Sequence, residues 1–265
     1  MDPLAPLISA LHSEGRLRVW SLVITIFGDL VQHRGGEIST VRLRALLGRV
    51  GVEQGALRTA LSRLGGDGWV TRERHGRTSR YRLSPQGMNR FGPATTRIYA
   101  APRSGPVDGW AAVLSVGENG AQEFRICPAD EAPEHADCMV VGDLAQVSAA
   151  YRDAMLSDEH RDALAALASD ISALQNEIAE PLDAAAARML LIHRWRRVVL
   201  RFPGIAAELM PKNAPLGDPR GSVAQAYAAL TPAAEAWLST TYDDMRPLPK
   251  VTNAAGKRFG KSLQA

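Results

Sequence analysis

The sequence is poor in cysteine, with only Cys127 and Cys138 among its 265 residues. Two cysteines without CxxC spacing exclude a disulfide-stapled scaffold and argue against a zinc or redox framework. Long apolar runs are also missing, because the longest, at 19–27, contains polar residues and is far shorter than the roughly 18–20 residues that a membrane span requires. The chain opens Met1-Asp2-Pro3 rather than with a basic segment, so we expect a soluble cytoplasmic protein with no membrane contact.

Sequence motifs of well-known enzyme classes are missing too. The chain contains neither a GxSxG nucleophile elbow nor a P-loop. His135 and Cys138 are three residues apart but have no further ligands at zinc spacing, and paired acids such as Asp243-Asp244 are usually solvated. We therefore expect no enzymatic activity, no metal and no cofactor.

Lysine is absent from residues 1–100, which carry 15 arginines and 7 acidic residues and thus a formal net charge of +8. The remaining residues have a net charge of −5, so the total of +3 conceals an uneven distribution. A basic first third predicts a module that binds a polyanion. Arginine favours bidentate contacts with phosphates and guanine edges, although high-GC codon usage would produce the same bias.

Apolar periodicity divides this basic third into helices and a hairpin. The predicted elements are helices at 17–31, 40–48 and 53–64, strands at 69–74 and 78–83, and a helix at 85–99. Ser39 or Thr40 is a suitable N-cap for the second helix, and Ser84 precedes a proline that suits the first turn of the last helix. Three helices followed by a basic hairpin are the order of a winged helix-turn-helix, which binds DNA.

The third helix and the hairpin carry the candidate DNA contacts. The apolar positions of the helix leave its polar side chains on one outward face, so that i,i+4 pairs such as Arg58 and Ser62 project together. The hairpin arginines would reach phosphates or the minor groove. The predicted contacts are Gln54, Arg58, Thr59, Ser62, Arg63, Arg72, Arg74, Arg77, Ser79 and Arg80. The alternative is a solvated arginine surface on an unrelated helix and hairpin.

The rest of the chain is less basic and changes composition twice. A linker rich in proline, serine and glycine at 100–106 precedes strand candidates at 110–116, 123–127 and 138–141. Later the chain is rich in alanine and leucine, with predicted helices at 147–156, 159–178, 183–201 and 222–242. We expect an α+β protein with a DNA-binding domain at 1–99, a small α+β unit at 107–145, a helical domain at 146–246 and a disordered tail at 247–265.

Motifs at both ends of the chain form a specific set. They are RLRVW at 16–20, ALRTALSRL at 56–64, GWV at 68–70, GRTSRYRLS at 76–84, RIY at 97–99, LIHRWRR at 191–197, FPGIAAELMP at 202–211 and PAAEAWL at 232–238. As a set, the motifs resemble those of the PaaX-like repressors of phenylacetic acid degradation. The resemblance covers about two-thirds of the chain.

This resemblance implies a homodimeric transcriptional repressor that binds double-stranded operator DNA and is released from it by an acyl-CoA effector such as phenylacetyl-CoA. It also implies a winged helix, a ferredoxin-like middle domain and a helical C-terminal domain. Residues 117–121 stand where the family has a longer, helix-containing segment, so we expect an abbreviated middle domain. The alternative function is an acyl-CoA-handling enzyme or ligand-binding protein whose winged helix serves protein interaction.

The predicted helix at 183–201 carries the candidate effector site. It consists of His193, Arg194, Trp195, Arg196, Arg197 and Arg201. Arginines suit the phosphates of a CoA ester, and tryptophan suits its adenine. The competing interpretation places Trp195 and His193 in the core and the arginines in structural ion pairs. We favour it, because side chains on all sides of one helix cannot face one ligand.

Overall fold

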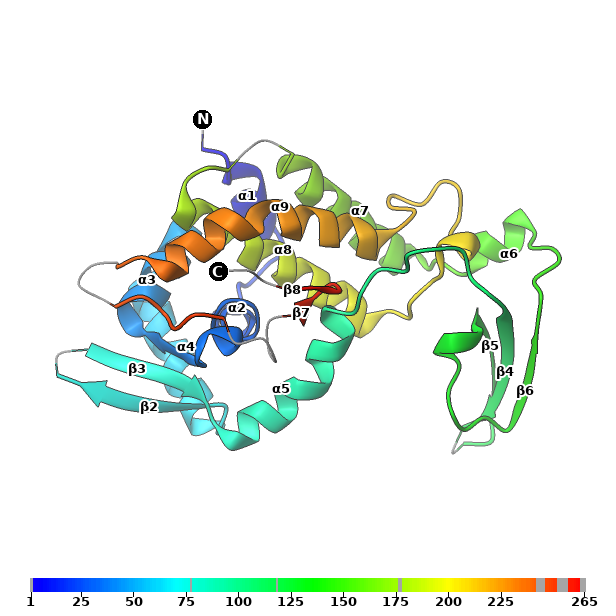
Figure 1. Ribbon diagram of the computed structural model, residues 1–265, viewed down its shortest axis with the longest axis horizontal. Helices are drawn as coiled ribbons and strands as arrows, with labels where there is room; N and C mark the ends of the chain where they lie inside the picture. The colour runs from blue at the N-terminus through cyan, green and yellow to red at the C-terminus, as the bar shows by residue number, and fades with distance from the viewer. Residues whose placement is uncertain are drawn as a thin grey trace. The chain divides into compact units, whose positions relative to one another are not determined.

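The computed structural model describes residues 2–76, 78–117, 119–175, 178–241, 246–251 and 257–262 (Figure 1). It is a mixed α and β structure that divides into two compact units. Unit 1 contains Met1–Pro102, Ala166–Arg201 and Arg220–Ala265, and unit 2 contains Arg103–Ala165 and Phe202–Pro219. The chain therefore leaves unit 1 and returns to it twice.

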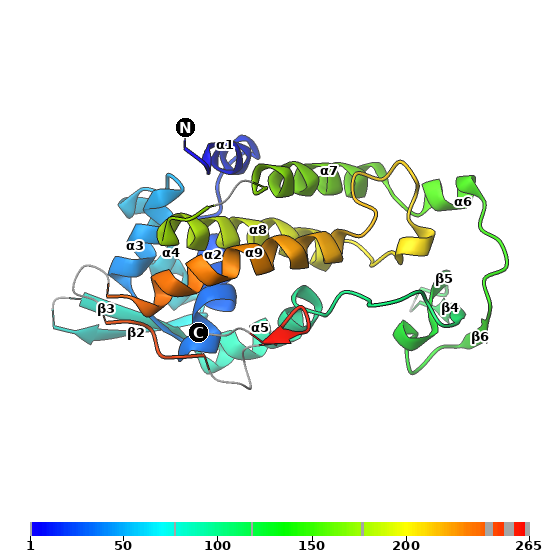
Figure 2. The ribbon, with the colours of Figure 1, turned by 45° about the horizontal axis from the view of Figure 1, so that its top comes forward.

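Unit 1 is built around two buried helices. Its helices are α1 (Ala5–Ser13), α2 (Val19–Ile26), α3 (Thr40–Arg49), α4 (Gln54–Gly66), α5 (Pro85–Ile98), α8 (Pro181–Arg201) and nearly all of α9 (Pro219–Ser239), together with the second half of α7 (Asp158–Ala173). The apolar α2 packs on α4 and α8, and α8 also packs on α3 and α5 (Figure 2). A π turn at Phe27–Val31 and a 3-10 turn at Gln32–Arg34 extend α2. The extension ends at Gly35 and Gly36, whose φ angles are +84° and +73°.

Unit 1 also contains a three-stranded antiparallel sheet. Its strands β1 (Glu37–Ser39), β2 (Val70–His75) and β3 (Thr78–Leu83) lie in the order β1-β3-β2. Ser39 caps α3 by accepting a hydrogen bond from the Arg42 backbone at 3.2 Å, and Ser84 caps α5 in the same way. The helices, hairpin and caps predicted for the first hundred residues are confirmed, with small shifts of their ends.

Unit 2 contains a second three-stranded antiparallel sheet. Its strands β4 (Trp110–Val116), β5 (Gln122–Pro128) and β6 (Cys138–Gly142) lie in the order β5-β4-β6, close to the predicted positions. The unit also contains α6 (Ala149–Ala154), the first half of α7 and a 3-10 turn at Ala207–Leu209. In the described part of 103–148 the only helical turn is Ala129–Glu131, so the two helices that cover a ferredoxin-like sheet are not found there.

The C-terminal part differs from our expectation in two ways. The stretch 146–246 is no separate domain, because α8 packs on α2, α3 and α5 and the sequence between α7 and α9 is shared between the units. The tail is not wholly disordered, because its described residues 246–251 and 257–262 pack on unit 1. Leu248 and Phe259 are buried, and the Phe259 ring packs edge-on against Tyr99 with centroids 5.6 Å apart. Their apolar side chains hold the described parts of the tail in place.

Candidate nucleic-acid interface

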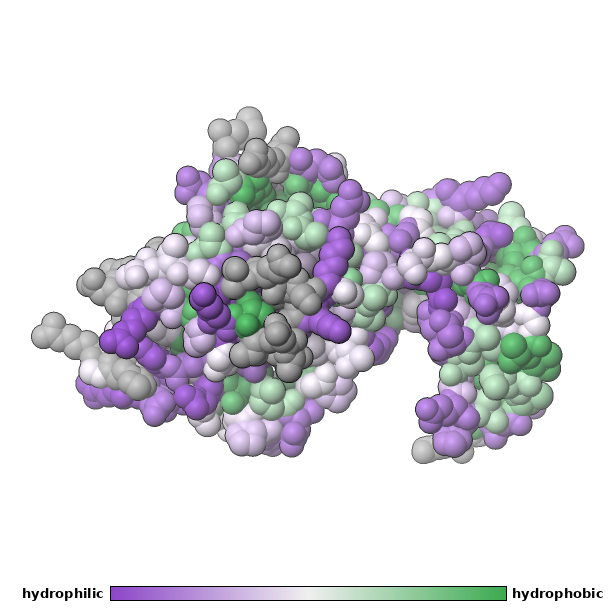
Figure 3. Space-filling model, viewed as in Figure 1, coloured by the Kyte–Doolittle hydropathy of each residue, from purple (hydrophilic) through white to green (hydrophobic). Residues whose placement is uncertain are grey.

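Helices α3 and α4 and the β2–β3 hairpin enclose a groove of about 350 Å³. Three arginines line it, one from each element: Arg44 from α3, Arg58 from α4 and Arg72 from β2. Its other polar lining residues are Thr40, Gln54, Thr78, Ser79 and Tyr81. Hydrophilic side chains dominate the molecular surface over the hairpin (Figure 3). We call the groove lined by Arg44, Arg58 and Arg72 the arginine groove.

The outward face of α4 borders the arginine groove. Leu57, Ala60, Leu61 and Leu64 are buried and anchor the helix. The five predicted contacts on α4, namely Gln54, Arg58, Thr59, Ser62 and Arg63, are all exposed. Gln54 and Arg58 line the groove, whereas Arg63 pairs with Asp67 on the helix surface at 3.6 Å. The structure therefore brings two of the five to the groove and leaves the others on the open face of the helix.

The two faces of the β2–β3 hairpin carry different arginines. Arg72 pairs with Tyr81 across the strands and its Nε donates to Ser79 Oγ at 2.9 Å, so this face lines the groove. Arg74 lies two residues further along β2 and, since side chains alternate along a strand, belongs to the same face. Arg77 lies outside the described residues.

The opposite face of the hairpin holds Arg80 in an ion pair. Arg80 and Arg82 donate to the carboxylate of Glu37 on β1, at 2.8 and 2.7 Å. Burial of Glu37 opposes its charge, but the two hydrogen bonds outweigh burial and lower its pKa. Arg80, which we predicted as a DNA contact, is thus engaged in the sheet and does not line the groove.

Sequence reasoning missed Arg44 and Tyr81. Both lie in elements that were predicted, but only the three-dimensional arrangement brings α3 and β3 against α4. The signal that could have found Arg44 is the α3 pattern, in which Arg42 is buried and Arg44, two residues later, is exposed. Arg42 itself points inward and donates to the backbone oxygens of Trp237 and Thr240.

A buried network of charged side chains joins the segment before β1 to α8 and α9. Arg34, just before β1, donates to Glu235 of α9 at 2.7 Å, and Arg188 of α8 pairs with Glu235 at 2.8 Å and with Asp29 at 3.1 Å. Burial alone would raise the pKa of Glu235, but the hydrogen bonds with His33 and Arg34 and the charge of Arg188 hold it well below its usual value. The network thereby ties the extension of α2, which leads into β1, to α8 and α9.

The candidate effector residues of α8 do not share one site. Trp195 is buried and donates through Nε1 to the Ile98 oxygen at 2.8 Å, and Arg196 donates to Thr25 Oγ1 at 2.9 Å. His193 also hydrogen-bonds to Thr25 Oγ1, at 3.1 Å. Burial and the neighbouring arginines lower the pKa of His193 to about 3. These three side chains hold α8 against the rest of unit 1.

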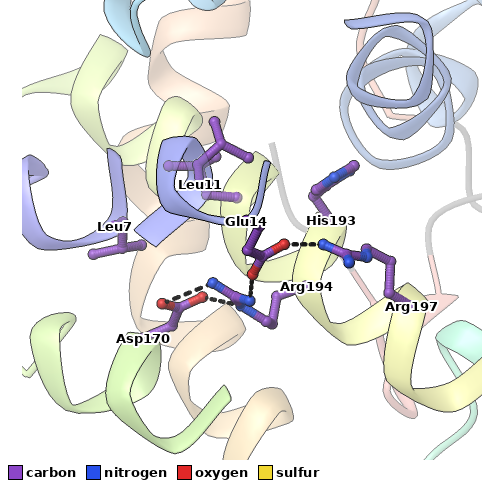
Figure 4. A pocket seen from close by; sticks show the side chains of 8 residues that line it. Leu7, Leu11, Glu14, Asp170, His193, Arg194 and Arg197 are labelled. Carbon is purple, nitrogen blue, oxygen red and sulfur yellow. Dashed lines mark hydrogen bonds and ion pairs between the residues drawn. The ribbon is translucent and has the colours of Figure 1, made fainter. Parts of the chain in front are cut away.

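The remaining arginines of this cluster meet acidic side chains or lie at the helix end. Arg194 pairs with Asp170 of α7 at 2.6 Å and with Glu14, and Arg197 also pairs with Glu14 (Figure 4). The small cavity beside them has a volume of about 10 Å³, room for about one water molecule. Arg201 is exposed at the end of α8. These contacts agree with the interpretation in which the arginines of α8 form structural ion pairs rather than an effector site.

Other kinds of site are not found in the part of the chain that the structure describes. No group of three or more His, Cys, Asp or Glu side chains is placed to hold a metal ion. None of the described helices combines the length and the apolar character that crossing a bilayer demands. Asp243 and Asp244 lie outside the described residues.

Arginines on a helix-and-hairpin groove define a candidate polyanion-binding protein, and comparisons with known proteins specify its family. Family models for "PaaX-like protein" and "PaaX-like protein C-terminal domain" match residues 18–87 and 143–240. The chain belongs to the PaaX-like family. It is 28% identical to "Transcriptional repressor PaaX" of Escherichia coli (strain K12), over 91% of this chain and 89% of that protein. The solved "Uncharacterized protein Rv0674 from Mycobacterium tuberculosis" is 17% identical, with 82% and 97% coverage and a TM-score of 0.47.

Proposed function

We propose that the protein is a DNA-binding transcriptional repressor, acting in the cytoplasm, and that α2, α3, α4 and the sheet β1-β3-β2 form a winged helix-turn-helix. The observation that carries the proposal is the arginine groove, where α3, α4 and the hairpin each contribute one arginine beside the outward face of α4. An α-helix of this kind fits the DNA major groove, and flanking arginines fit the phosphates on its edges. The repressor name of the E. coli relative supports the same function.

In this proposal, base reading and phosphate binding fall to different side chains. Arg58 and Ser62, one turn apart on the exposed face of α4, would meet base edges. Arg44 and Arg72 line the groove beside that face, Arg74 shares the hairpin face of Arg72, and all three would meet phosphates. Thr59 and Arg63 continue the α4 surface and would contact the flanking backbone.

The operon and effector follow from the family resemblance. We propose that the protein represses an aromatic, phenylacetate-type catabolic operon and that an acyl-CoA such as phenylacetyl-CoA releases it from DNA. Three of the six predicted effector residues of α8, namely His193, Trp195 and Arg196, hold the helix in place, so the proposal does not include them. Arg197 and Arg201 are exposed, whereas Arg194 is 12% exposed and pairs with Asp170.

We propose a homodimer that forms through one face of the unit 2 sheet. Strand alternation and register gather ten side chains on that face, which we call the open sheet face. They are Trp110, Ala112, Leu114, Val116, Gln122, Phe124, Ile126, Pro128, Cys138 and Val140. None is charged, Phe124 and Val140 are 57% and 63% exposed, and hydrophobic atoms gather on the surface over this sheet (Figure 3). A second copy fits this surface, because helix-turn-helix dimers bind two half-sites and a twofold interface is self-complementary.

A substitution on α4 tests the proposed function. Arg58→Gln should weaken binding to the operator by about 1–3 kcal/mol and relax the base preference at one position of each half-site, because a bidentate contact is lost. The measurement is fluorescence anisotropy on the operator and on single-base variants of it. Arg161→Gln is the control, since Arg161 is an arginine of unit 2 whose Nη1 donates to the backbone and side-chain oxygens of Asn213. Equal effects of the two substitutions would contradict the α4 assignment.

A further inference from the structure

The C-terminal tail, residues 246–265, differs in composition from the rest of the chain. It contains five lysine and arginine residues and no acid, whereas residues 101–245 carry 21 acidic and 11 basic residues. Three of the four lysines of the chain lie in the tail, at positions 250, 257 and 261. Codon usage that favours arginine over lysine therefore does not explain this segment. A segment with charge of one sign indicates a polyanionic partner.

The described parts of the tail are held on unit 1 mainly through their backbone. Arg34, which is buried, donates to the Leu248 and Pro249 oxygens at 3.2 and 3.0 Å. The Phe259 amide donates to the Tyr99 oxygen at 2.9 Å. These parts of the tail are thus ordered before any partner binds, which spares the partner the entropic cost of ordering them.

This anchoring leaves most of the cationic side chains of the tail in solvent. Four of the five are exposed, namely Arg246, Lys250, Lys257 and Lys261. None of these four side chains has an ion-pair partner within the part of the chain that the structure describes. Arg80 and Arg82 of the hairpin, by contrast, are paired with Glu37. The tail therefore presents charges that no acid of the described residues neutralises.

The first part of the tail lies next to elements that border the arginine groove. Arg42 of α3 donates to the backbone oxygen of Thr240, shortly before the tail. Pro249 packs on Gly35, two residues before β1, since a Cβ at Gly35 would be 2.9 Å from the proline ring. In both ribbon views the orange-red first part of the tail runs between α9 and β3 (Figure 1, Figure 2). The backbone that carries Lys250 thus lies beside α3 and the β1-β3-β2 sheet.

We propose that the four exposed cations of the tail form a second DNA-binding surface, which we call the basic tail surface. It contacts backbone phosphates next to the half-site that faces the arginine groove, without regard to base sequence. Lysine suits this role, because its ammonium group is a flexible point charge that binds phosphate without the fixed fork geometry of arginine. The proposal rests on the proposed repressor function, since the tail supplies part of the phosphate contacts of the same complex.

The salt dependence of DNA binding tests the basic tail surface. Lys250→Gln, Lys257→Gln and Lys261→Gln together should weaken binding to the operator and to an unrelated duplex by the same factor, about ten- to hundredfold at about 0.1 M salt. The slope of log K against log salt should become shallower by about two units for a dimer, because each subunit loses one phosphate contact. The measurement is fluorescence anisotropy on both duplexes at several salt concentrations. An unchanged slope would overturn the proposal.

Two control variants separate the charge of the tail from other effects of substitution. Lys212→Gln changes the one lysine outside the tail, which is exposed in unit 2, and should leave affinity and slope unchanged. Changing the three tail lysines to arginine keeps their charge and should preserve the slope of the unsubstituted protein. A loss in either control as large as in the triple glutamine variant would overturn the assignment to the charges of the tail.

The two duplexes separate this proposal from the proposed function. Preference for the operator, together with a triple glutamine variant that behaves like Lys212→Gln, would overturn the basic tail surface and leave the repressor function intact. Equal binding to both duplexes that the triple glutamine variant weakens would support the tail as a polyanion-binding surface and contradict the repressor function.

Discussion

Individual buried residues show why the arginine-rich run on α8 was ambiguous. Spacing on a helix reveals which side chains share a face, but not what lies opposite each face. The hydrogen-bond partner of His193 is Thr25 of α2, which lies 168 residues away in sequence, and the partner of Trp195 is the Ile98 oxygen. The sequence contains no local signal for these partners. It did support the competing interpretation, because six residues around one helix cannot meet one ligand.

His193 should make the stability of the protein depend on pH. Its pKa is lowered from about 6.5 to about 3 by burial, so the folded state keeps it neutral while the unfolded state takes up a proton. The contribution is therefore complete above about pH 6.5 and is lost as the pH falls toward 3. Between pH 8 and pH 5 we expect the free energy of unfolding to decrease by about 2 kcal/mol from this group.

Urea unfolding at several pH values measures this effect. His193→Gln should show a pH dependence that is shallower by this amount, whereas His135→Gln, which changes an exposed histidine of unit 2, should keep the original dependence. Identical pH profiles for the unsubstituted protein and His193→Gln would rule out the buried neutral imidazole.

At the scale of elements, local signals predicted more than distant packing did. Ser39 and Ser84 begin helices because their side chains cap backbone amides, and these starts were readable. The hairpin was readable from its turn and alternation, but which of its arginines face the groove was not, because that depends on Glu37 pairing from β1. α1 was not predicted at all.

The two faces of the hairpin should respond differently to substitution. Arg72→Gln should lower DNA affinity evenly across sequences and make the salt dependence shallower by about two units for a dimer, because each subunit loses one phosphate contact. Arg82→Gln should leave the salt dependence unchanged, since its guanidinium pairs with Glu37 on the opposite face. Binding titrations at four salt concentrations provide both slopes. A shallower slope for Arg82→Gln together with an unchanged slope for Arg72→Gln would reverse the assignment of the faces.

At the scale of the whole molecule, the predicted domains were wrong because each was taken as one continuous stretch of sequence. Composition changes near residues 100 and 146 predicted a linear series, but α8 and α9 return to unit 1 and complete its core. Because the tail is mostly polar, its sequence did not indicate that Leu248 and Phe259 are buried. Their burial depends on residues from distant parts of the chain, such as Tyr99. Such long-range packing has no signature in local composition.

The proposed dimer gives a matched pair of substitutions on neighbouring residues. Val140→Asp places a charge on the open sheet face and should shift the protein toward monomer, because desolvating an unpaired carboxylate is costly. Val141→Asp changes the next residue, which is 58% exposed and points to the opposite face. It should leave self-association intact. Sedimentation velocity distinguishes the two results, and dissociation by Val141→Asp alone would contradict the proposed interface.

The central claim is that a dimer reads DNA through α4 and holds it through arginines. The most direct test measures the affinity for the DNA upstream of its own gene and for an unrelated fragment of equal length over a range of salt concentrations. If each subunit engages about four phosphates, log K should fall with log salt with a slope near −7, and the upstream fragment should bind at least about a thousandfold more tightly. Equal affinity for both fragments with a shallow salt dependence would contradict the claim.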